Sequence, residues 1–292
     1  MRKLTYLVVA FAAVAMASCG MKTQPSEAAD SDTVCTPQEE PAAEIVELKT
    51  EKFSVTQKKG CWTYKSEAEY PVDGSEALVA GIRNWISESL RVSENPEENV
   101  KAYAGNMDDG KSMLDYYAKK FIASINFDDY AELPEDMECE MDYTFVIEHE
   151  TPEFVSFGVQ TYWFGGGAHG GTSVAGASFR KSDGRQLGWD IIASKKALRP
   201  MIIDGLKKYF EVKTDAELID NLLLAEEPAA GTPITSIVPY PATTPWLSAE
   251  GLVLIYQQYE ICSYAAGMPT VVIPWNKLKP LLKPEYQSLI AE

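Results

Sequence analysis

The chain has 292 residues, 46% of them apolar and 24% charged, which is enough length and apolar surface for a complete hydrophobic core. Its formal net charge is −17. A field of this sign repels nucleic acid and anionic membrane surfaces, so it argues against a nucleic-acid-binding protein and favours cationic partners. An acidic surface also simply keeps a protein soluble, which is the plainer interpretation of the charge.

The first eighteen residues have the pattern of a secretory signal peptide. Arg2 and Lys3 supply the positive start, and the apolar run over residues 4–14 is too short to span a bilayer as a helix. Met16-Ala17-Ser18-Cys19 then resembles a bacterial lipobox, with Met where Leu is usual. We expect cleavage before Cys19 and lipid attachment to its thiol. An ordinary secretory signal followed by a coincidental cysteine is the alternative.

A tether is predicted between the lipid and the folded body. Residues 20–50 are rich in Ser, Thr, Pro, Ala, Glu and Asp and contain no aromatic residue, so they cannot bury enough surface to order themselves. Residues 1–18 are therefore the predicted signal peptide, and residues 19–50 are the lipidated Cys19 and its disordered tether. The mature chain keeps 24 basic and 43 acidic residues, a net charge of −19.

These features predict an extracytoplasmic protein that is attached to a bacterial membrane by its lipid alone. In Bacteroidetes lipoproteins, an acidic cluster directly after the lipidated cysteine accompanies display on the outer surface. Gly20-Met21-Lys22-Thr23 lacks such a cluster, which favours the periplasmic face.

The cysteines fit an oxidising compartment. Five are present, and if Cys19 is acylated, an even number remains, namely Cys35, Cys61, Cys139 and Cys262. Three pairings are possible among these four, and the sequence does not choose between them. We expect at most one bridge among the last three, with reduced, buried thiols as the alternative.

The first half of the body mixes strands and helices. Residues 53–70 alternate around a Lys-Gly turn and predict a β-hairpin. Asp73-Gly74-Ser75-Glu76 resembles a capping box, with Asp73 as the N-cap of an amphipathic helix that continues to Leu90. A second helix is predicted over residues 113–125 after a long polar loop.

The second half begins with segments in which apolar and polar residues alternate with a period of two. Strands are predicted from residue 139 to Ile147, from Phe154 to Phe164 and from Thr172 to Arg180, with a hairpin signal at residues 182–184. The close spacing of these strands predicts an antiparallel meander.

Shorter elements follow the meander. Helices are predicted over residues 198–210, with Pro200 tolerable only in the first turn, and over residues 215–224. Strands at 252–259 and 270–273 precede a final helix at 275–282.

Helices and antiparallel strands in separate blocks indicate an α+β fold, with antiparallel sheets packed against a few helices. We predict two small subdomains in one body, an N-terminal one over residues 51–148 and a C-terminal one over residues 149–292.

The most unusual segment of the sequence is glycine-rich. Gly165-Gly166-Gly167-Ala168-His169-Gly170-Gly171 contains five glycines in seven residues. It lacks the Lys-Ser or Lys-Thr of a phosphate-binding loop, and no helix follows it. We predict an exposed connection between two antiparallel strands, because the segment offers almost no side chain to bury. It serves either as a wide turn alone or as a recognition surface made of His169 and free amides.

No catalytic residue, cofactor or metal ligand can be assigned from spacing. Ser173 has strand-forming residues after it instead of the helix that a nucleophile elbow needs. His149 and His169 flank a strand of about ten residues, roughly 33 Å long, so they cannot share a metal ion directly. No Cys/His cluster has the spacing of a zinc site.

Two segments together carry a family resemblance. The stretch from Tyr162 to Gly170, with Gly-Gly-Ala-His-Gly, looks like the signature of the domain shared by the anti-sigma factor RsiV and the peptidoglycan deacetylase PdaC. The stretch from Tyr259 to Leu282, with Tyr-x-Ile-x-x-Tyr-Ala-Ala-Gly, matches the C-terminal part of that domain. Residues 177–179 read Ala-Ser-Phe where the family often has Asn-Phe-Asp, and residues 53–130 resemble the companion N-terminal domain more faintly.

The resemblance implies an α+β recognition module and does not imply enzymatic activity. In PdaC the chemistry belongs to a separate deacetylase domain, and in RsiV the related external domain binds lysozyme. We therefore expect a monomeric, non-catalytic lipoprotein of the cell envelope whose partner is a cell-wall fragment or a cationic, lysozyme-like protein. An enzyme acting on peptidoglycan or another glycan is the alternative. The candidate binding surface comprises Tyr162, Gly165, Gly166, Gly167, His169, Gly170, Tyr259, Glu260 and Tyr264.

The lipid attachment can be tested by one substitution. In a Cys19→Ser variant the acyl acceptor is gone, so the protein should leave the membrane fraction or remain unprocessed. Membrane fractionation and the mass of the processed chain measure both results. Equal membrane retention of the variant and the wild type would contradict attachment through Cys19.

Overall fold

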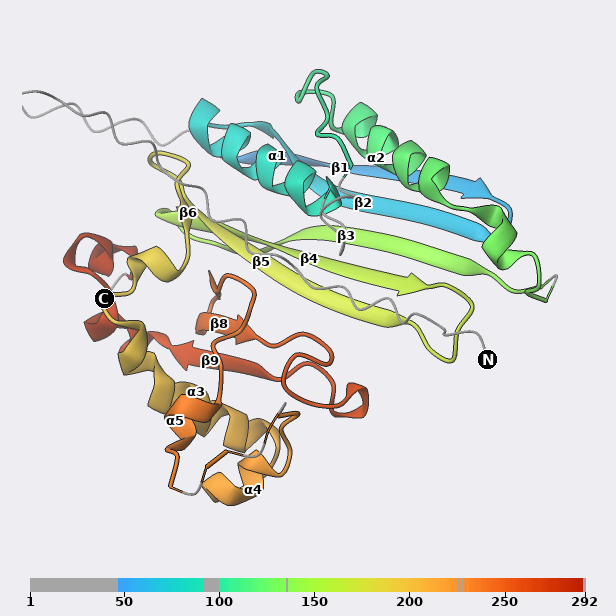
Figure 1. Cartoon of the computed structure of the whole chain (residues 1–292). Helices are drawn as coiled ribbons and strands as arrows, with labels where there is room; N and C mark the ends of the chain where they lie inside the picture. Colours follow the sequence, from blue (N-terminus) through green and yellow to red (C-terminus); the bar gives the residue numbers. More distant parts are fainter. Residues whose placement is uncertain are drawn as a thin grey trace, which may run out of the picture.

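The computed structural model describes residues 47–91, 100–134, 136–224, 226, 228–229 and 231–290. The predicted signal peptide, Cys19, Cys35 and residues 20–46 of the predicted tether lie outside the described residues. The end of the predicted tether is wrong, because Leu48 is buried in the core and Lys49 and Thr50 already belong to the first strand. The described part has an α+β fold with one six-stranded and one three-stranded sheet (Figure 1). None of its helices is both long enough and apolar enough to cross a membrane.

The large sheet has the strand order β1-β2-β3-β4-β5-β6. Its strands are β1 (Lys49–Lys59), β2 (Trp62–Asp73), β3 (Cys139–Glu150), β4 (Phe154–Phe164), β5 (Gly171–Arg180) and β6 (Gln186–Leu187). The predicted N-terminal hairpin is confirmed: β1 and β2 pair in antiparallel fashion around a turn in which Gly60 has φ +59°. The predicted meander is confirmed as β3 to β6.

One pairing in this sheet was not predicted. β2 and β3 run parallel, with Trp62 opposite Cys139 and Ala68 opposite Phe145. Parallel neighbours need a long crossover connection, and here it contains α1 (Glu76–Arg91) and α2 (Gly110–Ser124). Both helices lie on the same face of the sheet (Figure 1).

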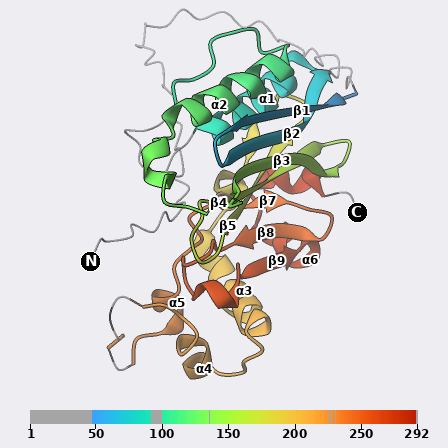
Figure 2. The same ribbon diagram turned by 90° about the vertical axis from the view of Figure 1, so that its right-hand side faces the viewer.

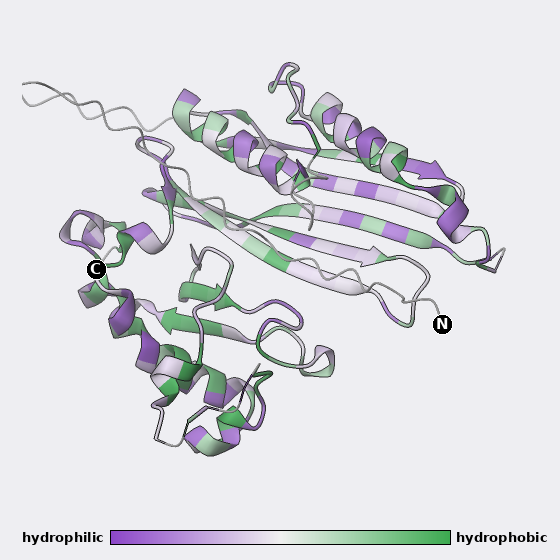
Figure 3. Cartoon of the chain, in the orientation of Figure 1, coloured by the Kyte–Doolittle hydropathy of each residue, from purple (hydrophilic) through white to green (hydrophobic). Residues whose placement is uncertain are grey.

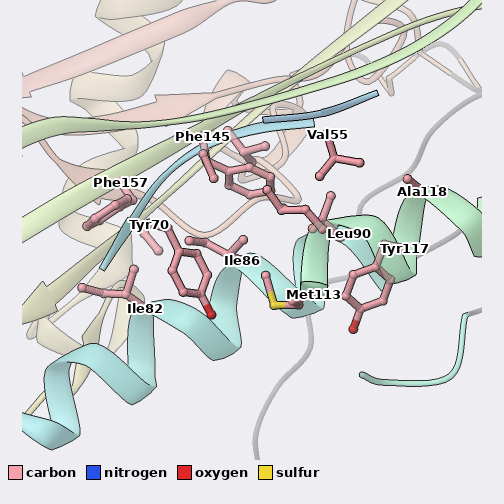
Figure 4. Packing of buried hydrophobic residues seen from close by; sticks show 14 of the residues in the cluster. Val55, Tyr70, Ile82, Ile86, Leu90, Met113, Tyr117, Ala118, Phe145 and Phe157 are labelled. Carbon is pink, nitrogen blue, oxygen red and sulfur yellow. The ribbon is translucent and has the colours of Figure 1, made fainter. Parts of the chain in front are cut away.

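The first core fills the space between these helices and the sheet. Ile82 and Ile86 of α1 and Met113 of α2 face Tyr70 and Phe145 of the strands (Figure 4). All five are at most 1% exposed, so burial of their side chains provides most of the driving force for this half.

The expected capping box of α1 is wrong in detail. Asp73 is the last residue of β2, where its carboxylate forms an ion pair with Lys49. The helix begins later, at Glu76, and the carbonyl of Ser75 accepts the first helical bond from Val79. At α2 the cap is a side chain, since Asp109 accepts a 2.9 Å bond from the amide of Ser112.

The C-terminal part has a small antiparallel sheet in the order β7-β8-β9. Its elements are α3 (Lys195–Tyr209), α4 (Asp215–Ile219), α5 (Ile234–Ile237), β7 (Trp246–Leu247), β8 (Gly251–Ile255), β9 (Thr270–Pro274) and α6 (Trp275–Leu278). Strands β8 and β9 are almost uniformly apolar, whereas α3 alternates between polar and apolar residues (Figure 3). This pattern fits a buried sheet that is covered by an amphipathic helix.

Three predicted boundaries in this part shift. Helix α3 begins at Lys195 rather than Leu198, which places Pro200 beyond the first turn. Helix α4 ends at Ile219, and β8 ends at Ile255. These are ordinary differences at the ends of elements, where local signals are weakest.

The sheets and helices form four layers. Figure 2 shows them in the order α1 and α2, the large sheet, the small sheet, and α3. The first hydrophobic core draws on residues as far along the chain as Phe179, while the second lies mainly after Leu187. The boundary expected at residue 148 falls inside the large sheet, because the hairpin between β3 and β4 crosses it.

The two sheets touch at a glycine. Gly176 of β5 is buried, and a β-carbon added to it would lie 2.3 Å from the indole ring of Trp246 on β7. The missing side chain therefore permits the close approach of the two sheets.

This contact can be tested with two identical substitutions. Gly176→Ala should lower the free energy of unfolding by about 1–3 kcal/mol, because the added methyl overpacks the interface. Gly167→Ala is the matched control, since a β-carbon there meets nothing within 4 Å. Denaturant unfolding of both variants measures the difference. Equal stability of the two would show that Trp246 does not pack tightly on β5.

Candidate functional site

The structure brings the two resembling segments together. The glycine-rich loop connects the antiparallel strands β4 and β5, and His169 in it is exposed, which confirms the predicted connection, although Gly171 is buried as the first residue of β5. The imidazole of His169 stacks on the ring of Tyr264 with a centroid distance of 4.0 Å and an interplanar angle of 25°. Residues almost a hundred positions apart thus form one surface.

The two segments meet because the outer edge of β5 needs partners. The short strand β6 pairs only with Ser178 and Phe179, so the edge before them lacks a neighbouring strand. The side-chain amide of Gln257 occupies this edge: it accepts a bond from the amide of Val174 at 3.1 Å and donates one to its carbonyl at 2.8 Å. A glutamine side chain thus replaces a paired strand.

Two further bonds extend this contact. The side-chain oxygen of Gln258 accepts from the amide of Thr172 at 2.9 Å, and the amide of Leu247 donates to the hydroxyl of Ser178 at 2.7 Å. Sequence reasoning missed both glutamines, because no local pattern marks a side chain that replaces a strand.

Beyond the glutamines, a tight turn directs two neighbouring side chains in opposite directions. Tyr259 adopts φ +66° and is 46% exposed. Glu260 points inward, where its carboxylate accepts bonds from the amides of Gln257 at 2.8 Å and Ala242 at 2.7 Å. Burial raises the pKa of Glu260 above its ordinary value, while these two bonds oppose that rise. Glu260 thus stabilises the turn, and Tyr259 is presented to solvent.

Tyr264 links the turn to the glycine loop. Its hydroxyl donates to the carbonyl of Gly170 at 3.0 Å, and the same carbonyl lies 2.9 Å from Nδ1 of His169. The ring of Tyr259 is next in line, 5.8 Å from that of Tyr264 at an angle of 34°. We name His169, Tyr264 and Tyr259 the aromatic row.

Tyr162 lies beside this row. A β-carbon at Gly170 would be 2.5 Å from the Tyr162 hydroxyl, so the glycine lets the tyrosine pack against the loop backbone. Burial first, and then the nearby Glu140, Tyr264 and Asp142, raise the pKa of Tyr162. Tyr162 therefore joins the aromatic row to a group of carboxylates.

The remaining glycines have different surroundings. Gly166 has φ +81° and packs against Leu133, where a β-carbon would lie 2.8 Å from the leucine side chain. A β-carbon at Gly165 would only touch Trp62, at 3.8 Å, and Gly167 faces open space. Gly166 and Gly170 are thus required by packing, whereas Gly165 and Gly167 leave the loop tip free of side chains.

Asp142 is an additional site residue that sequence reasoning missed. It lies opposite Tyr162 in the register of β3 and β4, on the same face of the sheet. Its Oδ1 is buried and has no hydrogen-bond partner among the described residues, and burial raises its pKa. A cationic group that approached Tyr162 would also meet this carboxylate.

The surface offers aromatic faces, tyrosine hydroxyls and carboxylates, whereas Ser173 lies buried inside the sheet. Among the residues that the structure describes, no three His, Cys, Asp or Glu side chains are grouped so that they could hold a metal ion.

With this geometry in place, the chain can be compared with known proteins. Residues 190–276 match the family described as "Protein of unknown function (DUF3298)". The matched segment spans 87 of the 292 residues. The match includes Tyr259, Glu260 and Tyr264. It begins at residue 190 and therefore does not include the glycine loop. No curated protein matches the chain.

Two crystal structures of DUF3298 proteins resemble the whole fold. A family member from Bacteroides fragilis has a TM-score of 0.61 at 15% identity, covering 83% of this chain and 96% of that one. A DUF3298 protein from Pseudomonas aeruginosa has a TM-score of 0.52 at 13% identity, covering 84% and 97%. At these identities the likeness establishes the α+β fold that extends well beyond the DUF3298 segment.

Two substitutions distinguish the residues that stabilise this surface from the residues that are only exposed on it. Gln257→Ala should lower the free energy of unfolding by about 1–3 kcal/mol, because it leaves the partly buried amide and carbonyl of Val174 without their partners. His169→Ala should change it by less than about 0.5 kcal/mol, as exposed positions usually do.

Denaturant titration of both variants gives the two values from the shift in midpoint. A large loss of stability in His169→Ala would mean that the imidazole is part of the core. No loss in Gln257→Ala would mean that water satisfies the β5 edge equally well.

Proposed function

We propose that this protein is a non-catalytic recognition lipoprotein of the bacterial cell envelope, and that the aromatic row is its binding surface. The observation that carries the proposal is the exposure of His169 and Tyr259 beside Tyr264, at the junction of the two sheets. Solvent-facing aromatic side chains on a rigid support are typical of binding surfaces, since they add contact area at a small cost in side-chain entropy.

The backbone at Tyr259 supports the same conclusion. A non-glycine residue with positive φ is disfavoured by about 1–2 kcal/mol, and Gly or Asn would adopt this conformation more easily. The exposed tyrosine ring adds little to the core in return. Strain of this kind at an exposed side chain favours a role in binding.

The partner is a cationic, lysozyme-like protein or a cell-wall fragment. Lys and Arg side chains bind tyrosine faces through cation–π contacts, and Glu140 and Asp142 beside Tyr162 add negative charge. The net charge of −19 expected for the mature chain would steer such a protein toward this surface. The sugar rings and free amines of a cell-wall fragment fit the same groups.

The sequence resemblance adds independent support. The glycine loop and the Tyr259–Leu282 segment resemble the RsiV and PdaC domain, whose members act at the cell wall or bind lysozyme. The predicted signal peptide and Cys19 would place the binding surface outside the cytoplasm, on the periplasmic side, at the end of a tether of about thirty residues.

A pull-down with immobilised lysozyme and with soluble muropeptides tests the proposal. The wild type should bind at least one of them at low salt and lose much of the binding at moderate salt, because the attraction is screened. The informative variant combines His169→Ala with Tyr259→Asn, which removes two rings and keeps a residue suited to positive φ. This variant should keep its stability and lose at least tenfold in affinity.

Val272→Ala on β9 is the control, since it trims an exposed apolar side chain that is not part of the aromatic row. It should bind like the wild type. Retention of neither ligand at low salt would reject both partners. Turnover of purified peptidoglycan that is lost in His169→Ala would replace the proposal with an enzymatic one.

A further inference from the structure

Two of the cysteines are neighbours in the large sheet, at the place where β2 and β3 begin. The amide of Cys139 donates a 2.8 Å hydrogen bond to the carbonyl of Cys61. The third described cysteine, Cys262, lies in the C-terminal part, where its sulfur is 3.8 Å from the carbonyl of Gly267. Cys61 and Cys139 therefore form a pair that the parallel register brings together.

The backbone geometry of this pair suits a disulfide. Because one hydrogen bond joins the two residues, standard bond lengths limit the separation of their α-carbons to about 7 Å, and the bond angles shorten it further. Disulfides bridge α-carbons that are roughly 4.4–6.8 Å apart. No movement of the strands is needed to bring the two residues within reach.

The side chains also face each other. The thiol of Cys139 is fully buried, and burial together with a hydrogen bond and charge from Cys61 raises its pKa to about 12. Cys61 is partly exposed at the edge of a cavity of about 360 Å³ that is lined by Phe127, Tyr130 and Leu133 among others. The Cys61 thiol is thus accessible to reagents, while the Cys139 thiol is buried beside it.

We propose that Cys61 and Cys139 form a disulfide when the protein enters an oxidising compartment. The oxidant is a reactive disulfide of the thiol-oxidase class. The Cys61 thiolate attacks one sulfur of that disulfide, which forms a mixed disulfide and releases the other sulfur as a thiol. Cys139 then loses its proton and attacks the Cys61 sulfur, so that the oxidant leaves as a dithiol and the two cysteines become one cystine.

The bridge would stabilise a pairing between strands that are far apart in the sequence. It closes the segment from residue 61 to residue 139, which contains β2, α1 and α2, and it joins the first residue of β3 to the residue directly before β2. Bringing together strands that are separated by a long crossover costs chain entropy. A covalent link removes that cost from folding, and its effect grows with the length of the closed segment.

Peptide mapping of the full chain after treatment with oxidised glutathione tests the proposal. Trypsin places the cysteines on separate peptides: Cys61 on residues 60–65, Cys139 on 121–180, Cys35 on 23–49 and Cys262 on 214–277. The expected product joins peptide 60–65 to peptide 121–180. Oxidation should also raise Tm by about 10 °C relative to the reduced protein, as a closed loop of this length predicts.

Variants make the assignment specific. Cys61→Ser changes only the exposed partner, and it should abolish both the cross-linked peptide and the difference in Tm between oxidised and reduced protein. Cys262→Ser is the control and should preserve both. Free thiols at Cys61 and Cys139 after oxidation would overturn the proposal, as would a stable glutathione adduct at Cys61 or a bridge from either residue to Cys35 or Cys262.

Discussion

The outer edge of β5 is the constraint on which the arrangement of the two sheets depends. An unpaired strand edge exposes amides and carbonyls that must bond to water, to another chain or to a covering element. Here β6 pairs with the end of the strand, and the side chains of Gln257 and Gln258 bond to the part before it. The C-terminal part is thereby fixed on the large sheet by directional bonds as well as by apolar contact. The surface between them follows from this contact, since the turn after the glutamines must lie beside the glycine loop.

Small residues on β5 set how closely the layers approach. Gly176 leaves room for Trp246, and the Ser178 hydroxyl, which is fully buried, bonds to the amide of Leu247 and to the hydroxyl of Ser156. The hydroxyls of Ser156 and Ser178 and the amide of Leu247 therefore have hydrogen-bond partners, which offsets the cost of burying them. A rigid junction of this kind is a suitable support for exposed aromatic residues, because it fixes their relative positions before any partner arrives.

Local patterns in the sequence were sufficient for the hairpin, the meander and the two long helices, because each depends on residues that are near one another in the chain. They were insufficient for the parallel pairing of β2 with β3, which spans a crossover of more than sixty residues. The neighbouring positions of Cys61 and Cys139 depend on that register, so the cysteine spacing alone left three pairings open. The candidate surface shows the same division. Its glycines and tyrosines were recognisable as motifs, whereas Asp142 and the two glutamines are defined only by what lies opposite them in space.

The residues of the turn after Gln257 have two different roles. Glu260 and the glutamines direct their polar atoms inward, where five hydrogen bonds to backbone groups fix the turn. Tyr259 faces outward in a backbone conformation that favours Gly or Asn, and its ring extends the stack of His169 on Tyr264. If stability alone determined this segment, the inward bonds would suffice and the strained tyrosine would be a net cost. The bonds that join the sheets therefore also hold an exposed aromatic surface in place. Folding does not require this surface, and for that reason we propose that it binds a partner.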